Sequence, residues 1–97
     1  MTDIAARFAE NLVVLRGRAG LSQGKTAERS GLHITEVSLL ERGLRLPRLD
    51  TIVKLAGGLG VEPCVLLVGM KWCLGQSEQL PGAYVSHGEF VERSEPA

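Results

Sequence analysis

The 97-residue sequence lacks the features that mark several large protein classes. No apolar run approaches the roughly 18 residues of a transmembrane helix, so we expect no membrane partner. The two cysteines, Cys64 and Cys73, are too few for a disulfide framework and are not spaced as in a zinc site. Neither glycine-rich motif that cradles nucleotide phosphates is present. These absences argue against a secreted, membrane-embedded or nucleotide-binding protein.

The sequence also lacks the side-chain sets that perform catalysis or bind metals. It has no Ser/His/Asp set, no Cys–His pair in a suitable context and no paired carboxylates in an apolar setting. The two histidines, His33 and His87, have no ligand spacing with the cysteines. The N-terminus carries Asp3 and no basic cluster before a long apolar run, unlike a signal peptide. We therefore expect a cytoplasmic protein that is not an enzyme and needs no cofactor.

The formal net charge of zero hides an uneven distribution. Residues 1–72 contain ten lysines and arginines against seven acids, a net charge of +3. Residues 73–97 contain one arginine against four glutamates, a net charge of −3. A basic body with an acidic tail fits either a polyanion partner for the body or ordinary surface solubility.

Helical periodicity is the main pattern that the sequence does contain. Apolar residues recur at helical spacing from Ile4 to Leu15. Ser22 has the character of an N-cap, and Gly31 stands where a left-handed residue ends a helix. Gly57-Gly58 is a local weakness that costs about 1 kcal/mol per glycine relative to alanine. The pattern predicts an all-α body of five helices at residues 3–18, 23–30, 33 or 34 to 42, 50–59 and 62–68.

The pattern changes after Met70. Residues 71–81 are turn-forming and polar without a clear period, whereas Tyr84-Val85 and Phe90-Val91 flank a Ser-His-Gly-Glu segment. This arrangement indicates a β-hairpin, which is marginal in water and needs a surface or a partner. Trp72, Tyr84 and Phe90 then form either a small satellite core or an interface. We divide the chain into a domain at residues 1–70 and an extension at residues 71–97, interpreted as a dimerisation element with a disordered end.

Two short predicted helices separated by only Gly31-Leu32 are the most informative feature. A tight glycine turn between helices with apolar anchors, the second helix having a polar outer face, is typical of a helix-turn-helix. The second helix of such a pair must project far enough to enter a DNA groove about 12 Å wide. The arrangement therefore favours a DNA-binding function.

Many further residues stand in register with this pair of helices: Leu15-Arg16, Gly20-Leu21-Ser22-Gln23, Ala27-Glu28-Arg29-Ser30-Gly31-Leu32, Val37-Ser38, Leu40-Glu41-Arg42-Gly43, Pro47, Thr51-Ile52, Leu55-Ala56, Leu59-Gly60-Val61, Pro63 and Leu66-Leu67. Over residues 7–68 the chain resembles the Cro/repressor-type (Xre-type) helix-turn-helix domain, which has a lambda-repressor-like fold. The resemblance implies a five-helix bacterial or phage protein. Such a protein binds double-stranded operator DNA as a homodimer and regulates transcription, usually as a repressor.

The resemblance assigns roles to individual residues. Gln23 matches a glutamine that bonds a phosphate and braces a recognition residue. The outward positions of the recognition helix are His33, Ile34, Thr35, Ser38 and Leu39, and the basic loop after it contains Arg42 and Arg45. The structural positions are Ala27 at the helix crossing, Gly31 in the turn, the buried anchors Val37 and Leu40, and the charge pair Arg16 and Glu41.

The chain departs from the family pattern in two places. Thr26 stands where the family has an aliphatic residue, and Ser30 where it has a small apolar one, so we expect an under-packed second helix. No Arg, Lys, Gln or Asn, the usual bidentate base readers, occurs between His33 and Glu41. Arg29 either contacts a phosphate or pairs locally. The alternative to a DNA-binding regulator is a protein-interaction module of the same fold, such as an antitoxin or adaptor, with Ile34 and Leu39 facing a protein.

Overall fold

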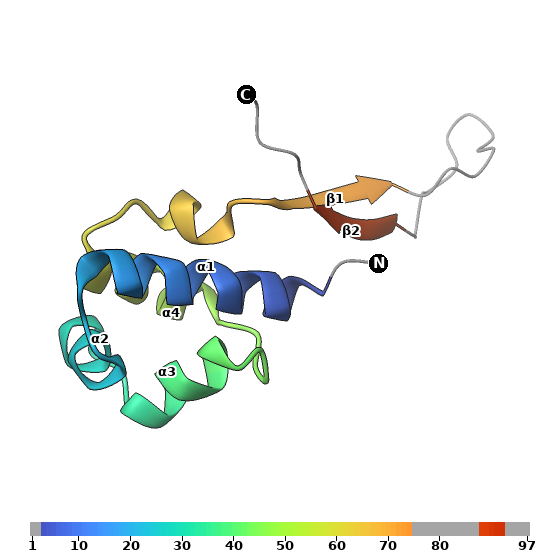
Figure 1. Cartoon of the computed structure of the whole chain (residues 1–97). Helices are drawn as coiled ribbons and strands as arrows, with labels where there is room; N and C mark the ends of the chain where they lie inside the picture. The colour runs from blue at the N-terminus through green and yellow to red at the C-terminus, as the bar shows by residue number, and fades with distance from the viewer. Residues whose placement is uncertain (1–2, 75–87, 93–97) are drawn as a thin grey trace, which may run out of the picture.

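The computed structural model describes residues 3–74 and 88–92. In these residues the chain forms four α-helices, a 3₁₀ helix and one antiparallel strand pair (Figure 1). The elements are α1 (Ile4–Ala19), α2 (Gln23–Ser30), α3 (Ile34–Glu41), α4 (Leu49–Leu59), η1 (Pro63–Leu67), β1 (Met70–Leu74) and β2 (Gly88–Glu92). None of the helices in these two ranges is both long enough and apolar enough to cross a membrane.

Capping residues set the helix boundaries. Asp3 accepts hydrogen bonds from the backbone N–H groups of the first turn of α1, and Ser22 accepts one from Lys25 at the start of α2. Gly31 ends α2 with φ of 64°, a left-handed conformation that favours glycine. The α2 range predicted from the sequence is confirmed at both ends.

The helices pack around one core. Its largest fully buried side chains come from four elements and are Phe8, Leu12, Val37, Leu40, Leu55 and Leu66. In Figure 1, α2 and α3 lie below α1, whereas η1 and the strands lie above it. The helix-turn-helix therefore lies on the opposite side of α1 from the hairpin.

The prediction of five helices needs one correction. The fifth element is a 3₁₀ helix of five residues rather than an α-helix at 62–68. Pro63 opens it, and Gly69 with φ of 87° follows closely, which leaves room only for a short, tighter turn. Its Leu66 is nevertheless fully buried, as the fifth helix of the family pattern requires.

The hairpin is present. Phe90-Val91 lies in β2, as the sequence indicates, and pairs with Trp72 and Lys71 of β1, whereas Tyr84-Val85 lies outside the described residues. The strand β1 was not predicted from the sequence. The Trp72 and Phe90 rings meet edge to face with centroids 4.9 Å apart, and Trp72 is 50% exposed, so this contact fits either a satellite core or an interface.

Candidate nucleic-acid interface

The turn between α2 and α3 is as tight as the sequence indicates. Leu32 donates its backbone N–H to the Ala27 carbonyl at 2.9 Å, and the left-handed Gly31 makes this reversal possible. Ala27 is buried where α2 meets its neighbours, so a larger side chain has no space there. The turn fixes the direction in which α3 leaves α2.

The helix α3 has a buried face and an exposed first turn. Val37 and Leu40 are fully buried, as predicted. Among the predicted outward residues, the three at the start of the helix are exposed and the two further along are half-buried: His33, Ile34 and Thr35, then Ser38 and Leu39. The start of α3 is therefore its most accessible part.

His33 caps α3 with its side chain. Its Nδ1 accepts a hydrogen bond of 3.2 Å from the backbone N–H of Thr35 and lies 3.1 Å from the Thr35 hydroxyl oxygen. This acceptor role belongs to the neutral tautomer whose ring proton is on Nε2. The exposed first turn of α3 thus contains two coupled polar side chains.

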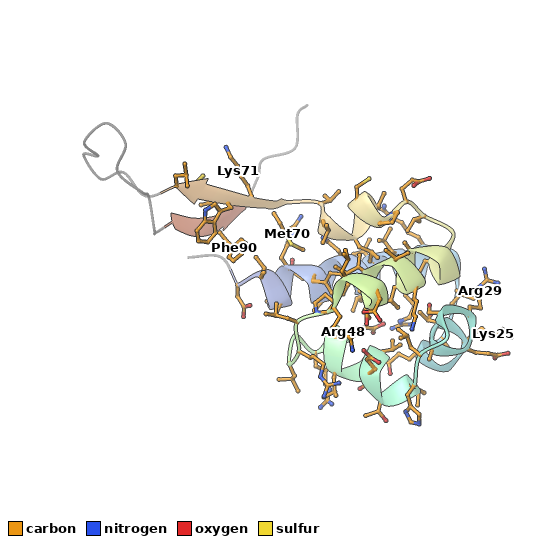
Figure 2. All side chains as sticks on the ribbon, turned by 180° about the vertical axis from the view of Figure 1, so that it is seen from behind. Lys25, Arg29, Arg48, Met70, Lys71 and Phe90 are labelled. Atoms are coloured by element: carbon orange, nitrogen blue, oxygen red, sulfur yellow. The ribbon has the colours of Figure 1, made fainter. Side chains whose placement is uncertain are left out.

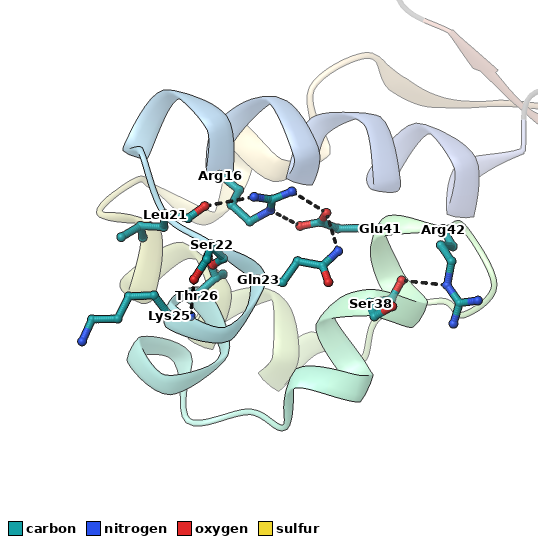
Figure 3. A network of polar contacts seen from close by, with 9 residues as sticks. All are labelled: Arg16, Leu21, Ser22, Gln23, Lys25, Thr26, Ser38, Glu41 and Arg42. Atoms are coloured by element: carbon teal, nitrogen blue, oxygen red, sulfur yellow. Dashed lines mark hydrogen bonds and ion pairs between the residues drawn. The ribbon is translucent and has the colours of Figure 1, made fainter.

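A polar network holds α3 against α1 (Figure 3). Arg16 donates from Nε and Nη2 to the two carboxylate oxygens of Glu41, at 2.5 and 3.0 Å, and from Nη1 to the Leu21 carbonyl at 2.9 Å. The charge pair implied by the family resemblance is therefore present, and the hydrogen bond to Glu41 raises the pKa of Arg16 above its ordinary value. The Gln23 amide donates to Glu41 Oε1 at 3.0 Å, so its NH₂ group braces the end of α3.

The loop after α3 is basic and exposed. Arg42, Arg45 and Arg48 are all exposed, and Arg42 Nε donates to the Ser38 carbonyl at 3.4 Å. Arg48 Nε lies 3.3 Å from an Asp50 carboxylate oxygen, and both side chains are exposed. Figure 2 shows Arg48 between α3 and α4, on the side of the molecule far from the hairpin. Three guanidinium groups thus flank the C-terminal end of α3.

Exposed apolar side chains accompany these arginines. Leu44, Leu46 and Leu49 are 65%, 58% and 78% exposed, and Ile34 at the start of α3 is 48% exposed. Singly exposed apolar residues are common on protein surfaces, but three strongly exposed leucines in one short segment of the chain are notable. The region around α3 is therefore both basic and apolar.

Sequence reasoning missed the residues that hold the remaining elements in place. Asn11, buried in α1, donates from Nδ2 to the carbonyls of Leu66 at 2.9 Å and Val68 at 2.8 Å. Arg29, for which the sequence leaves two roles open, donates from Nε to the Gly58 carbonyl at 2.7 Å and ties α2 to α4. The only signal for Asn11 was an amide within an otherwise apolar stripe.

Comparison with known proteins defines the class. The helix-turn-helix family model HTH_3 matches residues 14–66, which is more than half of the chain. The chain belongs to this helix-turn-helix family and is a DNA-binding transcription regulator of the Xre type.

Individual relatives are similar over the same region. The control protein C.BamHI of Bacillus amyloliquefaciens is 44% identical over 66 residues, which cover 67% of this chain and 82% of that protein. The structure of the restriction-modification controller protein C.AhdI from Aeromonas hydrophila matches with 42% identity and a TM-score of 0.62, over 64% of this chain and 94% of that one. A hypothetical transcription factor from Neisseria matches with 37% identity and a TM-score of 0.64, over 67% of this chain and 75% of that one.

Proposed function

We propose that the chain is a homodimeric repressor that binds operator DNA by placing the first turn of α3 in the major groove. The observation that carries this proposal is the exposed start of α3 together with three exposed arginines in the loop that follows its other end. Guanidinium groups beside a recognition helix are suited to phosphate contacts, which provide most of the affinity of such proteins. The family match supports a role in regulating transcription, which we place in the cytoplasm.

In this proposal each predicted residue contacts a particular part of the DNA, either a phosphate or a base. Arg42 and Arg45 contact phosphates. Gln23 donates one amide N–H to Glu41, which leaves its second N–H and its amide oxygen for contacts with DNA. His33, Thr35 and Ser38 face base edges, while Ile34 and Leu39 offer apolar contact to thymine methyl groups. The acidic extension is repelled by DNA, and its described strands lie on the other side of α1 from α3.

A protein-interaction module of the same fold is the second candidate. The exposed Ile34 and the exposed Leu44, Leu46 and Leu49 favour it, because exposed apolar surface marks protein contacts. The two candidates differ in how they respond to salt. Binding to a random duplex is measured by mobility shift at low and at moderate salt. A DNA-binding regulator shows salt-dependent binding to any duplex, whereas an adaptor shows none.

The homodimer includes the hairpin in our proposal. Apart from Met70, which packs against the core, the described part of the hairpin contacts mainly itself. Trp72 and Leu74 are 50% and 65% exposed and share one face of β1 with Met70. An open two-stranded sheet has unpaired edges that another strand can extend. A two-fold contact between copies pairs one edge of each hairpin with the same edge of the other. The hairpin also lies outside the residues that the family model matches.

The test of this contact leaves the helical body intact. Trp72→Glu removes the largest exposed apolar group of β1 while Met70 continues to cover the core. Lys71→Ala, on the other face of the same strand, is the matched control. Sedimentation at micromolar concentration should give a monomer for Trp72→Glu and a dimer for the control. If the Trp72→Glu protein remains dimeric, the dimer contact lies elsewhere. The same conclusion holds if a chain truncated after Val68 is still a dimer.

A further inference from the structure

The exposed first turn of α3 contains a threonine whose hydroxyl oxygen lies 3.1 Å from Nδ1 of its neighbour His33. A free threonine hydroxyl can donate to a base or accept from it, and it therefore reads sequence poorly. We infer that His33 is a positioning residue that turns Thr35 into an acceptor only, so that Thr35 selects bases with an exocyclic amino group. This inference rests on the proposed function, because it concerns the same DNA interface.

The proton positions follow from two distances around one nitrogen. The Thr35 backbone N–H, which can only donate, lies 3.2 Å from His33 Nδ1 and therefore requires a lone pair on that atom. The Thr35 hydroxyl oxygen lies 3.1 Å from the same Nδ1. In the tautomer with Nδ1 as acceptor, a hydrogen bond between these two atoms uses the hydroxyl proton, and the backbone N–H and the hydroxyl share the one lone pair of Nδ1. The Thr35 hydroxyl thus donates to His33, and only its oxygen lone pairs remain for a ligand.

Both side chains are available to a DNA duplex. His33 and Thr35 are exposed, and they stand at the end of α3 that the helix-turn-helix geometry turns toward base edges. The outward nitrogen of His33, Nε2, carries the ring proton and is a donor. The pair therefore presents the Nε2–H group of His33 as a donor and the Thr35 hydroxyl oxygen as an acceptor.

Base chemistry converts this polarity into a preference. In the major groove, adenine N6 and cytosine N4 are donors, whereas guanine O6 and thymine O4 are acceptors. An acceptor-only Thr35 pairs with the amino groups of adenine or cytosine and is repelled by the keto oxygens of guanine and thymine. The Nε2–H group of His33 pairs with an acceptor such as a purine N7 nearby.

The experiment uses the full chain and four duplexes. A binding site is first selected from a random pool, and the base read by Thr35 is identified as the position whose preference disappears in Thr35→Val. Affinities are then measured for duplexes that carry each of the four bases at this position. The wild type should prefer adenine and cytosine over guanine and thymine by about fivefold, the lower range for a single contact. Thr35→Ser, which keeps the hydroxyl, should retain the preference.

Two variants of His33 separate positioning from a purely structural role. His33→Asn keeps an oxygen acceptor at the N-cap for both Thr35 groups, so it should retain the amino preference. His33→Gly is tolerated at an N-cap but frees the hydroxyl, so the four duplexes should bind within about twofold of one another. Helix content by circular dichroism checks that both variants fold, and Ser38→Ala serves as the control at a different base.

Two results would overturn the inference. The first is an amino preference that survives in His33→Gly, including the case in which all four affinities fall equally, because His33 would then be a structural cap only. The second is a keto preference in the wild type. If DNA binding persists in these cases, the proposed function stands. Absence of binding to any duplex at low salt would remove both.

Discussion

The hydroxyl oxygen of Ser30 occupies the space that a side chain on Gly58 would need. A Cβ atom at Gly58 would overlap Ser30 Oγ and approach its backbone nitrogen to 3.1 Å, because α2 and α4 touch there. Gly57, one residue earlier, has nothing within 4 Å of such an atom. The two glycines that the sequence presents as one weakness therefore have different roles.

This difference predicts opposite effects of alanine. Gly57→Ala should stabilise the chain by about 0.5–1 kcal/mol, because it restricts the unfolded chain and adds helix propensity. Gly58→Ala should destabilise it by about 1–3 kcal/mol, because the new methyl group forces α2 away from α4. Urea unfolding measures both. Equal stabilisation by the two substitutions would show that α2 can move at no cost.

Removal of the Glu41 carboxylate should be among the most damaging polar substitutions. It leaves the guanidinium of Arg16 and the amide of Gln23 without their shared acceptor in a half-buried site. We expect Glu41→Ala to lower the free energy of unfolding by about 1–3 kcal/mol. Glu28→Ala removes a carboxylate whose partner Lys25 is exposed, and it should cost under about 0.5 kcal/mol. Comparable losses in the two variants would contradict the structural role of Glu41.

The charge of Arg16 gives this network its pH behaviour. Because the hydrogen bond to Glu41 raises the pKa of Arg16, the folded state holds its proton more tightly than the unfolded chain does. The resulting stability is fully present below the ordinary arginine pKa and is lost only as pH rises through the raised one. Arg16 therefore contributes no change in unfolding free energy between neutral and moderately alkaline pH.

Asn11 should be essential to the position of η1. Its amide satisfies the carbonyls of Leu66 and Val68, at the end of a 3₁₀ helix that has few other polar partners. We expect Asn11→Ala to cost about 1–3 kcal/mol, since the buried Leu66 carbonyl loses its side-chain donor, whereas the Val68 carbonyl keeps the one from Arg7. Hydrogen exchange of the backbone amides in 63–68 should rise more than that in α2. A loss below about 0.5 kcal/mol would show that water replaces the amide.

The arginine loop should act on DNA affinity rather than on sequence preference. With about four to six phosphates neutralised per dimer, log K should fall with log salt at a slope of about −4 to −5. Arg45→Ala should weaken binding to all sequences alike and flatten this slope by about one to two, because a dimer loses two contacts. Lys71→Ala removes the same charge from the hairpin and should leave the slope unchanged. A sequence-dependent effect of Arg45→Ala would instead assign this residue to base reading.

The elements that local signals define were predictable from the sequence. Ser22 and Gly31 carry their capping chemistry in their residue types, so the bounds of α2 follow without knowledge of its neighbours. Val37 and Leu40 follow from helical period alone. The family resemblance added the pair of Arg16 and Glu41, which no local rule would connect across 25 positions.

Contacts between distant segments were not predictable in the same way. Asn11 reaches carbonyls 55 and 57 positions away, and Gly58 is required by a serine on another helix. The first strand was missed because five residues of alternation give a weak signal, and its partner lies beyond a long intervening segment. The DNA-contact roles of His33, Thr35, Ser38, Arg42 and Arg45 stay predictions, because they concern a duplex rather than the fold.

The central claim is that two copies of this chain bind one duplex through α3. Hydroxyl-radical footprinting of the full chain on a duplex selected from a random pool tests it most directly. The account predicts two protected patches on one face of the DNA, with centres one helical turn or about 34 Å apart. Failure of the pool to enrich, or a duplex that stays unprotected at low salt, would contradict it.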